Sequence, residues 1–475
     1  MRHFPLLGFV VALAAASVTA ADSIDAAIKA LGKAARDGKL DDLAIITQTN
    51  DPRMAETVLD LINQKRVSGE VRARMTELVA EWPDAPGKAA LAVILAKNPR
   101  CSDEALLFFS ELGIPGTDNV FRAVMAEQRG KLPADFKNLP RVAAAIRGLG
   151  RFPEQSDAIV SYFATCLDDK APHIIRASTA EALGGMKNVG AVAALIPHVA
   201  DHAIGDIVLR SLYQLTGEDH GEDGAKWQAW FDAQGKKPEL KMLTRVAWTD
   251  YLAAKRLAAA ANPEAEQPDM ASFYGVKFRA RVALFILDTS GSMTGGRIEK
   301  LRGQMSNLLM AMQNAANAPR YGIILFNDGV ISCFSRGGIE DKRESSLKKA
   351  IRFVESIEAD GNTAMVSALR YAGKEIMPGG NVDTIFFLSD GEPSDGTDEN
   401  VLGMTRELFD KYRVRFNTIE ITEAAPPPVV PPPVVPPPPP TIPEKPPESS
   451  LLEKMALITG GTYTKPQAWA MEPNK

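Results

Sequence analysis

Hydrophobic positions along the chain follow two different patterns. Between residues 22 and 241 apolar side chains recur every three or four positions, and alternating patterns are nearly absent. This spacing places the apolar side chains along one face of a helix. We therefore expect residues 22–241 to form an all-α domain made of many short helices.

The helical pattern repeats toward its end. Leu149, Leu183 and Leu215 each close a similar apolar helix, at separations of 34 and 32 residues, and an amphipathic helix lies between each pair. A period of this length is typical of stacked helical hairpins. The stretch resembles a HEAT-like α-solenoid, most clearly over residues 140–232.

Histidine and tryptophan residues of this domain have a plain structural interpretation. His198 and His202 lie four residues apart, a helical spacing that is compatible with zinc, but no HExxH glutamate or nearby cysteine supports a metal site. We expect both histidines at the surface or at helix ends. Trp227 and Trp230 lie three residues apart, and we expect them to cover the open end of the stack rather than to hold a ligand.

The second pattern begins after a helical patch and linker at residues 242–272, where the polar linker is placed at 261–271. From residue 273 extended apolar runs alternate with amphipathic helical runs. This order predicts parallel strands with crossover helices, in an α/β domain over residues 273–470. The expected strands are 274–288, 321–328, 330–335, 382–391 and 414–422, the second and third forming a hairpin, and the expected helices are 298–312, 344–358, 363–377 and 400–413.

Three polar loops of the α/β domain fall at the carboxyl ends of strands, where such sheets bind ligands. Asp288, Ser290 and Ser292 follow the first strand, Thr363 opens a helix, and Asp390 follows the strand at 382–391. Hydroxyl and carboxylate oxygens suit a hard divalent cation such as Mg²⁺, which takes six oxygen ligands. The three loops at 288–292, 361–363 and 389–391 are therefore predicted to form a hard-cation site together.

The same residues carry a family resemblance. The spelling DTSGSM at 288–293, the TxxxxAL helix start at 363–369 and SDG at 389–391 resemble a von Willebrand factor type A domain with a metal-ion-dependent adhesion site. The resemblance covers roughly 275–470 apart from one insertion, and it implies a doubly wound, Rossmann-like sheet of strand order 3-2-1-4-5-6.

That resemblance also implies roles for the five residues. Ser290 and Ser292 would give direct hydroxyl ligands, and Thr363 would bind directly or through water. Asp288 and Asp390 would hold coordinated waters or bind directly. Mg²⁺ is the expected ion, with Mn²⁺ and Ca²⁺ as alternatives. In this family such a site captures a Glu or Asp of a protein ligand through an open position of the ion.

We expect a binding or adhesion protein and no enzyme. Ser290 lacks a GxSxG elbow, and no histidine follows residue 220 to serve as its base. One alternative is a scaffold in which the metal is only structural and the solenoid or a proline-rich arm binds the partner. A metal-assisted hydrolase that uses Asp288 or Asp390 as a base is the other. Asp395 and Asp398 are expected to cap the following helix, with a second cation site as the alternative.

A proline-rich insertion interrupts the α/β pattern at residues 424–448. It contains 14 prolines between Pro426 and Pro447, which predicts a stiff polyproline II arm. The arm begins after a strand and is therefore rooted on the face of the predicted metal. It is interpreted first as a loop without a partner, with two alternatives: a ligand for another protein, or a plug that places Glu444 or Glu448 at the metal.

Composition and charge argue against several classes of protein. The chain has 475 residues and a net charge of −5, which argues against nucleic acid as a partner. Three cysteines are too few for a disulfide framework. Residues 1–20 are interpreted as a signal peptide with cleavage after Ala20, with cleavage after Ala21 or an uncleaved membrane anchor as alternatives. The apolar run from Phe4 to Ala16 is shorter than the ~20 residues that a membrane span needs, and no other apolar stretch approaches its length. We therefore expect a secreted or periplasmic protein.

Overall fold

The computed structural model describes residues 20–466, except for 49–50, 65, 83–85, 98–100, 245, 249, 253, 255–270, 316–317, 336–337, 342 and 422–448. The expected signal peptide up to residue 19, the linker up to residue 270 and the whole proline-rich insertion lie outside the described residues. Within the described part, no helix combines the length and the apolar composition that crossing a membrane requires.

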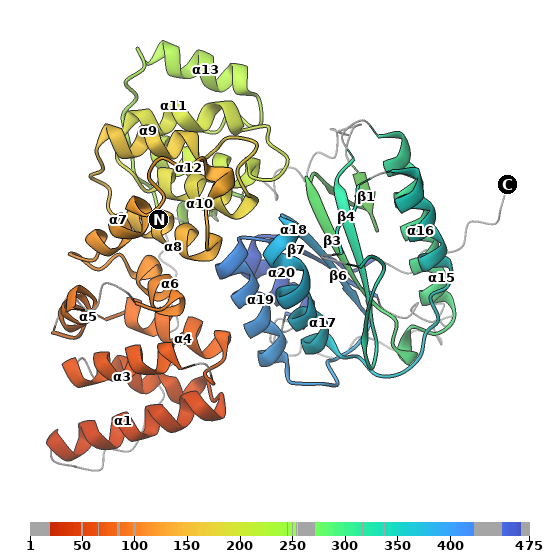
Figure 1. Cartoon of the computed structure of the whole chain (residues 1–475), viewed down its shortest axis with the longest axis horizontal. Coiled ribbons are helices and arrows are strands. Elements are labelled where there is room, and N and C mark those ends of the chain that lie inside the picture. The colour runs from red at the N-terminus through yellow and green to blue at the C-terminus, as the bar shows by residue number, and fades with distance from the viewer. Residues whose placement is uncertain are drawn as a thin grey trace, which may run out of the picture.

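The first domain is built of helices, and no residue that the structure describes before Ala271 belongs to a strand. Figure 1 shows these helices stacked in one elongated array beside the sheet of the second domain. They are α1 (Ala20–Asp37), α2 (Ile45–Gln48), α3 (Pro52–Asn63), α4 (Gly69–Ala80), α5 (Pro86–Lys97), α6 (Asp103–Leu112), α7 (Asp118–Ala126), α8 (Leu139–Gly150), α9 (Asp157–Thr165), α10 (His173–Gly184), α11 (Val189–Leu195), α12 (Gly205–Thr216) and α13 (Gly224–Ala233).

The repeat found in the sequence corresponds to α8, α10 and α12, with α9 and α11 between them. Leu149, Leu183 and Leu215 are all buried. Glycines let the three repeat helices approach closely, because a Cβ on Gly150 would lie 2.5 Å from Ala182 Cα. At the end of the stack Trp227 is fully buried on α13, as the covering role predicts.

The second domain is an α/β unit. Its elements are β1 (Ala271–Phe273), β2 (Val276–Phe278), β3 (Val282–Asp288), α15 (Gly296–Asn314), β4 (Arg320–Phe326), β5 (Val330–Ser332), α16 (Glu344–Glu355), α17 (Met365–Tyr371), α18 (Met377–Gly380), β6 (Thr384–Ser389), α19 (Asp398–Tyr412), β7 (Arg415–Glu420), α20 (Leu451–Thr459) and β8 (Tyr463–Thr464).

The main sheet has the strand order β5-β4-β3-β6-β7-β8, which confirms the predicted order. The edge strand β5 is antiparallel to β4, as the predicted hairpin requires, and the other pairs are parallel. Helices α15 and α16 cover one face of this sheet, and α17, α19 and α20 cover the other (Figure 1). All seven residues of β3 are buried, as expected for a central strand between two helical layers.

The apolar run at 274–288 is not a single strand, which corrects the prediction from the sequence. Tyr274 and Gly275 have positive φ angles of 50° and 78°, and they form a tight turn between β1 and β2. This small hairpin forms a separate two-stranded sheet. Phe273 packs its ring against Phe285 of β3, with ring centroids 5.3 Å apart, so aromatic packing holds the hairpin on the domain.

The two domains share a continuous apolar core. The side chains under α17, α19 and α20 belong to the same buried cluster as those of the solenoid. At this interface α4 and α19 interlock, since Gly69 lies against Glu407 and Gly403 lies against Glu70. Arg413, which follows α19, is buried and bonds to Glu111 at 2.8 Å and to Glu181 at 3.0 Å. The solenoid is therefore a packing partner of the α/β domain.

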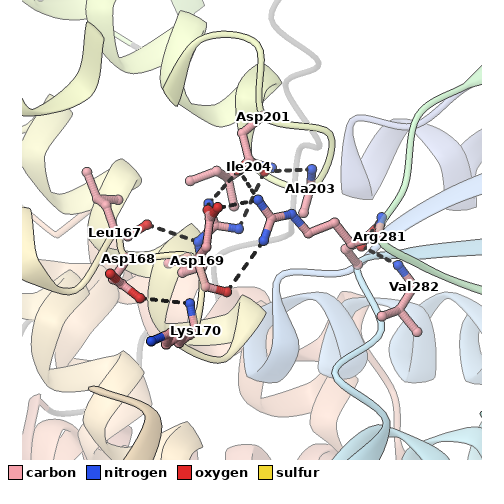
Figure 2. A network of polar contacts seen from close by, with 11 residues as sticks. Leu167, Asp168, Asp169, Lys170, Asp201, Ala203, Ile204, Arg281 and Val282 are labelled. Atoms are coloured by element: carbon pink, nitrogen blue, oxygen red, sulfur yellow. Dashed lines mark hydrogen bonds and ion pairs between the residues drawn. The ribbon is translucent and has the colours of Figure 1, made fainter. Parts of the chain in front are cut away.

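A second set of polar contacts holds the start of β3. Figure 2 shows Arg281 reaching two aspartates of the solenoid, Asp169 at 2.8 Å and Asp201 at 2.7 Å. From the other side Asp383 accepts hydrogen bonds from the backbone N–H groups of Arg281 and Val282, both at 2.8 Å. The strand that ends at Asp288 is thus fixed to the solenoid at its beginning.

Candidate metal centre

The centre is built around the end of the central strand. Asp288 is the last residue of β3 and is fully buried. Its Oδ1 accepts a hydrogen bond from Ser290 N at 2.8 Å, and its Oδ2 accepts one from Ser389 Oγ at the end of β6. Burial raises the pKa of Asp288 above its ordinary value, against the opposing effect of these hydrogen bonds. A bound cation would favour the carboxylate form.

Two serines extend the centre from Asp288 to Asp390. Ser290 Oγ lies 2.9 Å from Ser292 Oγ, and Ser292 Oγ donates to Asp390 Oδ1 at 2.7 Å. Asp390 follows β6, which is the neighbour of β3 in the sheet. Ser290 is buried whereas Ser292 is exposed, so the row of oxygens runs from the interior to the surface.

Thr363 is brought to the centre by backbone contacts between loops. Gly361 O accepts a hydrogen bond from Gly291 N at 2.9 Å, which joins the Thr363 loop to the serine loop. Gly361 has a φ of +75°, and a Cβ there would lie 2.4 Å from an Asp328 carboxylate oxygen. Only glycine fits this turn. Thr363 itself is 8% exposed, just before α17.

Hydroxyl oxygens of two loops lie beside Gly391, which belongs to the third loop. A Cβ on Gly391 would lie 3.8 Å from Thr363 Oγ1 and 4.0 Å from Ser292 Oγ. Both Gly391 and Ser292 are exposed, so the space beside Gly391 opens to solvent. Three hydroxyls and two carboxylates suit a hard cation such as Mg²⁺. The residues present therefore fit the ion that the sequence predicts.

The donor set differs from a cage of charged or imidazole ligands. Across the described residues, no group of three or more His, Cys, Asp or Glu side chains is placed to hold a metal. Neither His198 nor His202 takes part in such a group, and both are half-buried. The candidate centre at the carboxyl edge of the sheet consists instead of three hydroxyls and two carboxylates.

Two residues of the centre were missed by sequence reasoning. Arg297, in the first turn of α15, forms an ion pair with Asp390 Oδ2 and donates to Ser292 O at 2.7 Å. Ser389 donates to Asp288, as described above. The only signals in the sequence were the position of Arg297 five residues after Ser292 and the serine of the SDG motif.

The expected helix caps at Asp395 and Asp398 were wrong. Asp395 accepts hydrogen bonds from Val366 N at 3.0 Å and Ser367 N at 2.8 Å, so it caps the preceding helix α17. The cap of α19 is Thr397, which forms a capping box with Asn400, and Asp398 lies inside the first turn. Asp395 thereby fixes α17, the helix that begins just after Thr363. The sequence alone does not reveal this contact.

Comparisons with known proteins agree with this fold. A family model described as von Willebrand factor type A domain matches residues 283–392, a range that contains all five candidate ligands. A second model with the same description matches residues 8–95. The residues that the structure describes in that range form helices and no strand, so this second match does not correspond to the fold there.

Individual relatives match only part of the chain. Inter-alpha-trypsin inhibitor heavy chain H6 of Homo sapiens is 32% identical over 123 residues, which are 24% of this chain and 9% of that protein. Inter alpha-trypsin inhibitor, heavy chain 4, of Mus musculus is 26% identical over 121 residues, 24% of this chain and 12% of that protein. The chain therefore spans a small fraction of the length of these relatives. A solved von Willebrand factor type A structure from Catenulispora acidiphila has a TM-score of 0.30 and 18% identity, covering 40% of this chain and 39% of that one.

Proposed function

We propose that the chain is an extracytoplasmic binding protein that captures an acidic side chain of a protein partner through a divalent cation. The match of residues 283–392 to a von Willebrand factor type A model supports this proposal. The cation, Mg²⁺ first and Mn²⁺ or Ca²⁺ as alternatives, would be held by Asp288, Ser290, Ser292, Thr363 and Asp390. The observation that carries this proposal is the convergence of hydroxyl oxygens from two loops on the exposed space at Gly391.

The donor set supports a binding role for the ion. A bound divalent cation supplies a Lewis-acidic centre that attracts a carboxylate. Five side chains provide fewer ligands than the six oxygens of an octahedral ion if each binds once. Gly391 and Ser292 lie at the open side of the centre, where a carboxylate of another molecule has access. Asp288 and Ser290 lie on the buried side and hold their oxygens in place.

We also propose a cellular location for the protein and no enzymatic role. The signal peptide expected at residues 1–20 would direct the protein out of the cytoplasm, to a secreted or periplasmic location. We propose no catalytic function, because the sequence from residue 221 onward contains no histidine that could act as a base for Ser290. The scaffold alternative, with a purely structural metal, remains the competing hypothesis for the experiment.

Cation binding is tested by thermal unfolding of the full chain with and without Mg²⁺ or Mn²⁺. A ligand at 100 times its Kd stabilises the folded state by about 2.7 kcal/mol. We expect the wild type to gain this stability and Asp288→Asn to gain none. Asparagine is the suitable change because its Oδ1 can still accept from Ser290 N and its amide can donate to Ser389 Oγ.

Asp341→Ala serves as the control, since Asp341 is a half-exposed carboxylate on the same domain that forms an ion pair with Arg343. It should respond to the cation as the wild type does. A wild type that shows no cation-dependent shift contradicts the proposed function. An Asp288→Asn variant that is already unfolded without added cation, as judged by circular dichroism, supports the scaffold hypothesis instead.

A further inference from the structure

We propose that acidic side chains around the metal centre restrict its partner to a Glu or Asp that is flanked by basic residues. This inference rests on the proposed function and adds the charge of the partner sequence on either side of the captured carboxylate. The loops around the centre are 289–296, 327–329, 358–364 and 390–397. Besides Asp390 they contain no lysine or arginine but five acidic residues, which are Asp328, Glu358, Asp360, Glu392 and Asp395.

Two of these acids lie on the Thr363 side of the centre. Asp360 N donates to Thr289 O at 2.9 Å, which places Asp360 beside the serine loop. Asp328 accepts hydrogen bonds from the backbone N–H of Asn362 at 3.0 Å and from its side-chain amide at 2.6 Å. Both acids are exposed. Their hydrogen-bond donors are neutral groups, so these bonds do not neutralise either carboxylate.

Two more acids lie on the Asp390 side of the centre. Glu392 directly follows Gly391, the exposed residue beside the hydroxyls of the centre, and it is exposed itself. Asp395 is also exposed, and its hydrogen-bond donors are backbone N–H groups at the start of α17. Within the described part of the chain, no lysine or arginine forms an ion pair with any of these four acids, Asp328, Asp360, Glu392 and Asp395.

Two arginines of α15 lie next to these loops, and both are paired. Arg297 pairs with Asp390, and Arg302 pairs with Glu299 at 2.8 Å. A divalent cation would be matched in charge by the two carboxylates among its candidate ligands. The exposed acids of the loops therefore give the surface around the loaded centre a negative potential, with the ion as a positive point within it.

This potential has opposite effects on two parts of a partner. The ion attracts a partner carboxylate at contact distance, whereas the surrounding acids repel it over the ~10 Å that charges reach at 0.1 M salt. Lysine or arginine side chains beside that carboxylate turn the repulsion into attraction. An extended peptide advances about 3.3 Å per residue, so basic residues two positions before and after a Glu lie within that reach. We expect such flanks to tighten binding about tenfold relative to neutral flanks.

The experiment uses the full chain saturated with Mn²⁺ and three peptides with acetylated and amidated ends. Their sequences are Lys-Ser-Glu-Ser-Lys, Ser-Ser-Glu-Ser-Ser and Lys-Ser-Gln-Ser-Lys. The Kd of each is measured by titration, as the broadening of its acetyl proton line by the bound Mn²⁺. The titrations are run at about 0.1 M and about 1 M salt, between which the screening length falls from ~10 Å to ~3 Å.

The test variant is Asp360→Asn/Glu392→Gln, which removes one charge on each side of the centre and leaves all five candidate ligands in place. Asparagine can still accept the hydrogen bond from Gly361 N. Asp341→Asn/Glu344→Gln is the matched control, because it removes the same charge at the opposite end of the sheet. These two residues follow Glu340, whose backbone bonds to Tyr321 at the start of β4.

At 0.1 M salt the wild type and the control variant are expected to bind Lys-Ser-Glu-Ser-Lys about tenfold more tightly than Ser-Ser-Glu-Ser-Ser. The ratio should fall below about threefold at 1 M salt and in Asp360→Asn/Glu392→Gln. Equal affinities of the wild type for the two Glu peptides overturn the inference while the proposed function stands. A preference that the test variant keeps in full overturns it as well.

Two further outcomes concern the proposed function itself. Lys-Ser-Gln-Ser-Lys is expected to bind at least tenfold more weakly than its Glu counterpart, because it offers the ion no carboxylate. If the Gln peptide binds as tightly as the Glu peptide, the ion does not capture a carboxylate, and both the proposed function and this inference are overturned. The same holds if the wild type binds no Mn²⁺ or broadens neither Glu peptide.

Discussion

At the scale of single residues, the centre depends on Gly391, which has no side chain. Gly391 leaves open the space that the hydroxyls of Thr363 and Ser292 face. Its φ does not lie in the left-handed region, so glycine is not required there by the backbone. The 3.8 Å and 4.0 Å separations from a Cβ are ordinary van der Waals contacts. A methyl group therefore fits into this space. It would displace a ligand bound by the two hydroxyl oxygens.

Gly391→Ala is accordingly expected to fold normally and to lose cation affinity. The methyl group would stand where the ion or its coordinated water belongs, and Mg²⁺ tolerates little departure from octahedral geometry. We expect at least a tenfold (~1.4 kcal/mol) weaker Mn²⁺ affinity by calorimetry, with an unfolding free energy within about 0.5 kcal/mol of wild type. Gly296→Ala is the control, since its Cβ would meet nothing within 4 Å. Equal affinities in the two variants would contradict the assignment of this space.

Residue chemistry made part of the centre predictable from the sequence. Asp288, Ser290 and Ser292 alternate after an apolar strand, and hydroxyls and carboxylates at strand ends indicate a hard-cation site without knowledge of the fold. Arg297 and Asp395 were not predictable in this way. Their contacts span 93 residues to Asp390 and 29 residues to Val366, so they depend on how loops meet in three dimensions.

At the scale of elements, periodicity predicted the helices and strands but not how closely they pack. Leu149 and Leu183 marked the repeat helices α8 and α10, and both are buried. The glycines next to them decide the packing distance, which a hydrophobic pattern does not encode. The β1–β2 turn was missed because a hydrophobic pattern does not encode backbone conformation either. Tyr274 has a positive φ, but apolar residues stand on both sides of it.

Gly150→Ala tests this close packing. The added Cβ would lie 2.5 Å from Ala182 Cα, and a backbone atom cannot move away without shifting α10. We expect the unfolding free energy to fall by about 1–3 kcal/mol, as for an overpacked core. Gly303→Ala, at an exposed position in α15 where a Cβ meets nothing within 4 Å, should instead stabilise by about 0.5–1 kcal/mol. Urea unfolding of both variants measures the difference, and equal midpoints would mean that the repeat helices can separate freely.

At the scale of the whole molecule, the solenoid and the α/β domain are joined by buried polar groups as well as by the shared core. The backbone N–H of His173 donates to Asn381 Oδ1, and its Nε2 lies 3.2 Å from Arg413 O. These contacts span 208 and 240 residues of sequence, and no local pattern predicts them. The same histidine makes the interface sensitive to acid.

The pKa of His173 is lowered to about 4, chiefly by burial; Arg415 and Arg176 also lower it, whereas the contact with Arg413 O and the charge of Asp201 raise it. The neutral imidazole therefore belongs to the folded state. Its contribution to stability is complete above the ordinary pKa of about 6.5, and it is lost as the pH falls from there toward about 4. Between pH 7 and pH 5 this loss amounts to about 2 kcal/mol, because the unfolded chain takes up the proton first.

His173→Gln removes the titrating group while keeping a side chain that can donate to Arg413 O. Its unfolding free energy should fall by about 2 kcal/mol less than that of wild type between pH 7 and pH 5, as measured by urea unfolding at both values. Between pH 7 and pH 8 the two proteins should change in parallel, which serves as the internal control. An equal acid sensitivity of both proteins would show that the imidazole is protonated within the folded interface, and that acid acts on the two-domain unit at another place.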